Sequence, residues 1–165
     1  MTTESAWEQR LAELWAALDD LGPADFLAQA EALAAERPPG DGIALFELAS
    51  ANDSTGRPEQ AAPLYRQALA AGLTGPRRRR AVIQLASTLR NLGRPEESVV
   101  LLTAEREAAS DDLDDAVAAF LALALADTGR EREAAGLALA ALARHLPRYN
   151  RSLAAYAGAL SDPLT

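Results

Sequence analysis

One short motif recurs along the chain and constrains its fold more than any other feature. The sequence Thr-Gly-Arg-Pro-Glu at residues 55–59 returns as Leu-Gly-Arg-Pro-Glu at 92–96 and as Thr-Gly-Arg-Glu-Arg at 128–132. A weaker copy at 21–25 begins Leu-Gly-Pro. The glycines of the four copies are 34, 37 and 36 residues apart, at Gly22, Gly56, Gly93 and Gly129. Such a period is typical of chains built from stacked pairs of helices.

Each of these glycines separates two stretches whose apolar residues recur at helical spacing. A glycine just past a helix end can take the left-handed conformation that other residues resist. Pro58 and Pro95 then stand in the first turn of the next helix, where a missing N–H costs nothing, and acidic residues follow them. The pattern predicts helices over 4–21, 24–36, 42–54, 58–71, 77–91, 95–109, 112–127, 131–145 and 149–160.

Composition agrees with an all-α chain and narrows the classes of partner. Valine and isoleucine are scarce, and no long segment alternates apolar with polar residues, so no sheet is expected. The formal net charge of −8 disfavours nucleic acid as a partner. The N-terminal residues lack the pattern of a signal peptide, and no apolar run reaches membrane-spanning length. No membrane is therefore expected as a partner, and the absence of cysteine fits a reducing compartment, so we expect a cytoplasmic protein.

The repeats resemble the tetratricopeptide repeat (TPR), whose fingerprint is W-x2-L-G-x2-Y, then A-x3-F, then proline. Leu45-x2-Leu48-Ala49 and Val82-x2-Leu85-Ala86 keep the first part, and Ala61-x3-Tyr65 keeps the second. Ala134-x3-Ala138 has lost the aromatic residue, and no proline ends the second and third repeats. The stretch 72–93 also resembles a bacterial family of short standalone TPR proteins without an assigned reaction, over residues 40 to 160.

The resemblance implies a fold and a domain organisation. We expect one domain over 1–165, a right-handed α-α superhelix of about four helix-turn-helix repeats with a C-terminal capping helix. Trp7 and Trp15 could cover the N-terminal end of the stack. The expected repeats are 4–39, 42–74, 77–110 and 112–147, and the capping helix is 149–160.

The same resemblance implies a binding surface, because the first helices of TPR repeats line a concave groove that holds a peptide or a helix of a partner. Leu123 and Asp127 are expected on or near this surface. The alternative is a solvated or self-packed face without a ligand. The residues assigned to the groove by analogy are Phe46, Ser50, Asp53, Arg80, Ile83, Gln84, Ser87, Arg90, Asn91 and Phe120.

Four consecutive arginines, Arg77 to Arg80, open one of the predicted helices, where the helix dipole prefers anions. One interpretation pairs them with acidic residues of neighbouring repeats, such as Asp41 and the aspartates of 111–115. The other gives some of them a carboxylate-rich partner, since arginine suits bidentate carboxylate contacts. The sequence leaves both interpretations open.

No residue pattern in the chain indicates catalysis. His145 is the single histidine and is expected in the last turn of a helix, where a cation complements the dipole. No metal site, phosphate loop or serine elbow is recognisable, so no catalytic residue, metal or cofactor is expected. We therefore expect a non-catalytic protein-interaction module. A homodimer formed through the ends of the solenoid is the alternative, and an enzyme is the least favoured.

Overall fold

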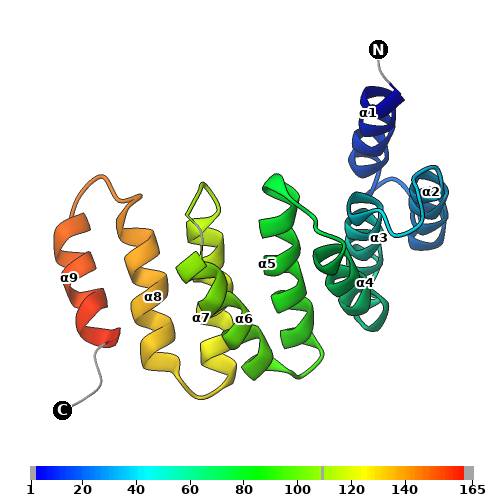
Figure 1. Cartoon of the computed structure of the whole chain (residues 1–165). Coiled ribbons are helices and arrows are strands. Elements are labelled where there is room, and N and C mark those ends of the chain that lie inside the picture. The colour runs from blue at the N-terminus through cyan, green and yellow to red at the C-terminus, as the bar shows by residue number, and fades with distance from the viewer. Residues whose placement is uncertain (1–2, 109, 162–165) are drawn as a thin grey trace. The chain divides into compact units, whose positions relative to one another are not determined.

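The computed structural model describes residues 3–108 and 110–161, and these residues form helices and connecting turns without any strand (Figure 1). The all-α prediction is confirmed, and most helix bounds lie within two residues of the predicted ones. The helices are α1 (Thr3–Ala16), α2 (Pro23–Ala35), α3 (Gly42–Ser54), α4 (Pro58–Ala70), α5 (Gly75–Asn91), α6 (Pro95–Ala108), α7 (Asp114–Asp127), α8 (Glu131–Ala143) and α9 (Asn150–Ser161).

Three of the four motif glycines are left-handed hinges between two helices, as predicted. Gly56, Gly93 and Gly129 have φ of 76°, 73° and 76°. Gly22 was expected to behave in the same way, and that expectation is wrong. It has φ of −66° and ψ of 149° and is the N-cap of α2, because Pro23 at the first helical position already sets the direction of the chain.

The hinge at Gly93 allows a direct test of this assignment. A Cβ atom added there would meet no atom within 4 Å, so the cost of Gly93→Ala is conformational only. We expect a loss of about 1–2 kcal/mol in the free energy of unfolding, measured by urea denaturation. Gly158→Ala is the matched control, since Gly158 lies inside α9 with equally open space and alanine favours helix. If both variants lose the same stability, the left-handed hinge is not the cause.

The predicted end of the first helix is wrong by five residues, and the start of α7 is shifted by two. Helix α1 ends at Ala16, and residues 17–21 form turns in which the amides of Asp20 and Leu21 donate to the carbonyl of Ala17. Helix α7 begins at Asp114 instead of residue 112, because Asp111 makes a local turn in which its carboxylate accepts from the backbone N–H of Leu113 at 2.7 Å.

The chain divides into two compact units, Met1–Ala81 and Val82–Thr165, and α5 runs from the first into the second. In the first unit α2 packs on α3, and α3 packs on α4. Phe26 is fully buried there, with Trp15 edge-on to it at 5.1 Å between ring centroids. This core contains Leu14, Phe26, Leu27, Ala30 and Ala51, covered by Trp15, Leu18, Leu21 and Leu33.

In the second unit consecutive helices from α6 to α9 pack against one another. Several of the core residues are alanines, which let the helices approach closely. Phe120 and Leu137 pack against this core while staying partly exposed. The buried residues are Ile83, Ala86, Leu102, Val117, Leu121, Ala122, Leu125 and Ala134, so the second part of α5 lies beside α7.

Candidate functional site

In the second unit, the residues that the sequence assigned to the groove lie on α5 and α7. Gln84 and Ser87 are half-buried, and Asn91 is exposed. The Nε atom of Arg90 lies 2.5 Å from Oδ2 of Asp127, so that an ion pair joins the C-terminal ends of α5 and α7. Ile83 is buried in the core, and Phe120 is partly buried against it. These helices therefore share a face that is polar along α5.

Along α7 the same face is apolar. Helix α7 has apolar residues on all sides between its terminal aspartates, a pattern typical of a helix that is covered all round. Nevertheless Ala119, Leu123 and Ala126 are exposed, at the i, i+4 and i+7 spacing of one helical face. Leu123 has 45% of its surface accessible. The two alanines were missing from the predicted site, because alanine fits any face of a helix and carries no positional signal.

In the first unit, two of the expected groove residues are covered. Phe46 is fully buried against Tyr65, at 6.2 Å between ring centroids, and Ser50 is 3% exposed. Neither side chain presents surface to a ligand. Asp53 is half-buried, and Arg80 is exposed with its guanidinium carbon 5.3 Å above the Phe46 ring. The Phe46 ring thus stabilises the position of the Arg80 guanidinium through a cation–π contact.

Exposure at one repeated position changes from repeat to repeat. Ser50, Ser87 and Leu123 each stand six residues before a hinge glycine. The side chain is buried at 50, half-buried at 87 and exposed, at 45%, at 123. The residue at this position is also apolar only in α7. The candidate site is therefore the face of α7 that contains Leu123 together with the adjoining residues of α5, and we call it the Leu123 face.

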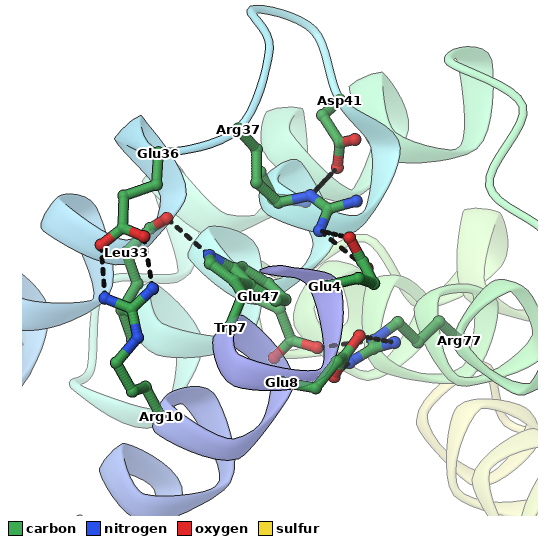
Figure 2. Close-up of polar contacts among 11 residues, drawn as sticks. Glu4, Trp7, Glu8, Arg10, Leu33, Glu36, Arg37, Asp41, Glu47 and Arg77 are labelled. Carbon is green, nitrogen blue, oxygen red and sulfur yellow. Dashed lines mark hydrogen bonds and ion pairs between the residues drawn. The ribbon is translucent and has the colours of Figure 1, made fainter. Parts of the chain in front are cut away.

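The arginine run contributes to a different cluster, shown in Figure 2, that attaches α1 to the rest of the first unit. Arg77 donates from Nε to Glu47 at 2.8 Å and from its terminal nitrogens to Glu8 at 3.0 and 2.6 Å. The carboxylate of Glu47 also accepts from the indole N–H of Trp15 at 2.9 Å and is nearly buried. We call Glu8, Glu47, Arg77 and Trp15 the α1 clamp.

A second set of contacts holds the start of α1. Trp7 donates its indole N–H to the carbonyl of Leu33 at 2.8 Å, and Arg37 lies 4.6 Å above the Trp7 ring. Arg37 also donates to Glu4 and Asp41. The sequence placed Asp41 beside the arginine run, but Asp41 pairs with Arg37 and caps α3 by accepting from Ala44 N–H. The partners of Arg77 are glutamates of α1 and α3.

The electrostatics of these contacts keep both partners charged. Burial raises the pKa of the Asp41 carboxyl, but the hydrogen bonds from Arg37 and from the Ala44 N–H outweigh burial and hold that pKa below its ordinary value. Burial lowers the pKa of Arg77, and the hydrogen bonds to Glu8 and Glu47 reverse the shift. Arg37 and Arg77 therefore stay charged and attach α1 through their ion pairs with Glu4 and Glu8.

His145 was expected in the last turn of a helix, and that expectation is wrong. Helix α8 already ends at Ala143. The Nε2 atom of His145 lies 2.7 Å from Oδ2 of Asp115, and Arg144 pairs with the other oxygen of the same carboxylate. Within the described residues, no group of histidine and acidic side chains is arranged to hold a metal ion. None of the helices in the described part combines the length and the apolarity needed to cross a membrane.

Comparison with known proteins identifies the repeat. A family model described as "Tetratrico peptide repeat" matches residues 42–160, which include α3 to α8 and nearly all of α9. Helices α1 and α2 precede the matched region. No curated protein and no solved structure shows significant similarity to the chain.

Proposed function

We propose that this chain, which belongs to the tetratricopeptide repeat family, binds a segment of another protein on its Leu123 face. Repeats of this family generally mediate protein–protein interaction and typically act as non-catalytic scaffolds. This proposal keeps the groove residues of the second unit that are at least partly exposed and adds Leu123 to them. These residues are Gln84, Ser87, Arg90, Asn91, Phe120 and Leu123.

The exposed apolar row on α7 is the observation that carries this proposal. Ala119, Leu123 and Ala126 leave apolar surface in water, where its burial by a partner is favourable at roughly 25 cal/mol per Å². A partner with apolar side chains at helical spacing fits such a row. The ion pair of Arg90 with Asp127 at one end supplies a charged border, which adds specificity more than affinity.

The polar residues of α5 define the other half of the expected ligand. Gln84 and Asn91 each have an amide group that can donate and accept, and the Ser87 hydroxyl can do both as well. A peptide backbone or polar side chain beside the apolar row would match them. The preferred ligand is therefore an amphipathic helix or extended segment with one apolar edge and one polar edge.

Leu123→Glu tests the proposal because the side chain is exposed enough to be replaced without disturbing the core. Leu142→Glu is the matched control, since Leu142 on α8 is 49% exposed and receives the same change of charge. Partners captured by the unaltered chain are identified by mass spectrometry, and their affinities for both variants are measured by calorimetry. We expect L123E to weaken binding at least tenfold and L142E to leave it unchanged. Equal affinities of the two variants would remove the Leu123 face from consideration.

The alternative of self-association through the ends of the solenoid has one observation in its favour. Tyr156 on α9 is 70% exposed, and Arg151 is the one charged residue of that helix. The two tryptophans considered for the other end are engaged within the first unit instead. Light scattering decides this alternative, because a mass equal to one chain at every concentration rules it out.

A further inference from the structure

The loop between α8 and α9 and the first turn of α9 bring several basic residues together on an otherwise acidic chain. Arg144, His145, Arg148 and Arg151 lie within eight residues, and no acidic residue lies among them. Asp115 pairs with Arg144 and His145. Arg148 and Arg151 are exposed, and their side chains form no ion pair with any residue that the structure describes. The N-terminus of α9 adds the positive end of its dipole at the same place.

Tyr149, the last residue of this loop before α9, has an unusual conformation. Its φ is 65°, and it is the one residue other than glycine with a positive φ in the described part of the chain. Its carbonyl accepts the first hydrogen bond of α9, from Leu153 N–H at 2.9 Å. The side chain is 78% exposed, so packing does not compensate for the strained backbone. Glycine would suit this position better for folding alone.

An exposed aromatic residue between two exposed arginines offers a ligand apolar surface and positive charge at the same place. We propose that Arg148, Tyr149 and Arg151 form a second binding surface, separate from the Leu123 face, for an acidic segment of a protein partner. The two guanidinium groups pair with carboxylates, and the Tyr149 ring covers an apolar side chain between them while its hydroxyl donates a hydrogen bond.

The charge distribution favours an acidic peptide over a nucleic acid. A net charge of −8 repels a long polyanion, whose phosphates extend well past the basic segment 144–151. A short acidic segment needs to approach this loop only. Because the surface charges are screened by salt within about 8–10 Å at 0.10–0.15 M ionic strength, the affinity for such a segment should fall as salt is added.

The test uses the whole chain and a fluorescein-labelled peptide of six glutamates interrupted by two leucines, titrated at 50 mM salt and followed by fluorescence anisotropy. We expect saturable binding that weakens at least tenfold in the double variant R148E, R151E. The control double variant R57E, R94E has the same net charge but alters exposed arginines of other loops, and it should retain most of the affinity.

Tyr149→Gly separates binding from folding. If the tyrosine serves a ligand, Y149G raises the thermal midpoint by about 2–4 °C, because the strain is relieved, and weakens peptide binding at least threefold. Tyr149→Phe should keep part of the affinity. The proposal is overturned if Y149G binds the peptide as tightly as the unaltered chain, or if both double variants lose equal affinity. Preferential binding of a twelve-nucleotide single-stranded RNA would overturn it as well.

Discussion

Replacing Arg77 by methionine is expected to lower the free energy of unfolding of the first unit by about 2–4 kcal/mol. Arg77 is the shared cation of the α1 clamp, and its loss leaves the nearly buried carboxylate of Glu47 with the indole N–H of Trp15 as its remaining partner. An uncompensated buried charge is costly because the protein interior solvates it poorly. Both tryptophans of the chain lie in α1, so fluorescence during urea unfolding reports its detachment directly.

Two further variants isolate the cause of this loss. Arg10→Met removes the ion pair of Arg10 with Glu36, in which both side chains are nearly half exposed, and should scarcely change the unfolding curve. Combining Arg77→Met with Glu47→Leu removes the buried charge along with its partner and should recover at least half of the lost stability. If the double variant is no more stable than R77M, packing of the arginine stem and not charge pairing holds α1.

Tyr65→Ala is expected to cost about 3–5 kcal/mol, the largest loss among the substitutions considered. Tyr65 occupies the aromatic position of the repeat on α4 and is fully buried beside Phe46. Its removal opens a cavity next to the residue that supports Arg80. Since small domains have only about 5–15 kcal/mol of stability, a large part of the total would be lost. Urea denaturation followed by circular dichroism measures the change.

Tyr65→Phe is the matched control for the cavity. The hydroxyl that this change removes donates to the Ser50 hydroxyl at 3.4 Å, which is a long hydrogen bond. We therefore expect the free energy of unfolding to fall by at most about 1 kcal/mol. A loss in Y65F comparable to that in Y65A would assign the stability of this region to the hydrogen bond instead of the ring. Burial raises the pKa of Tyr65, so its hydroxyl stays protonated to a higher pH than the hydroxyl of an exposed tyrosine.

The helical architecture was readable from the sequence because its signals are local. A glycine past a helix end, a proline in the next first turn and apolar residues at helical spacing each act within a few residues. These signals located all nine described helices and the hinges at Gly56, Gly93 and Gly129. The same reasoning failed at Gly22, where the neighbouring Pro23 supplied the turn without a left-handed glycine.

The candidate site was only partly readable because exposure is a tertiary property. Phe46, Ile83 and Ala119 stand at the same distance from their hinge glycines, yet two of them are buried and the third is exposed. The pairing of Glu47 with Arg77 likewise depends on how helices pack, because the partners are 30 positions apart and the segment between them contains other acidic candidates. Sequence periodicity specifies which residues share a helix face, but it does not specify what covers that face.

By itself, the sequence determined that this chain is a series of helix pairs of the tetratricopeptide kind, because turn and helix preferences depend on neighbouring residues. Only the tertiary structure decided that Arg77 holds α1, that Phe46 and Ser50 are covered and that Leu123 is open. Burial and ion pairing arise from packing between helices that are distant in sequence, and the periodicity of one helix contains no information about its neighbours.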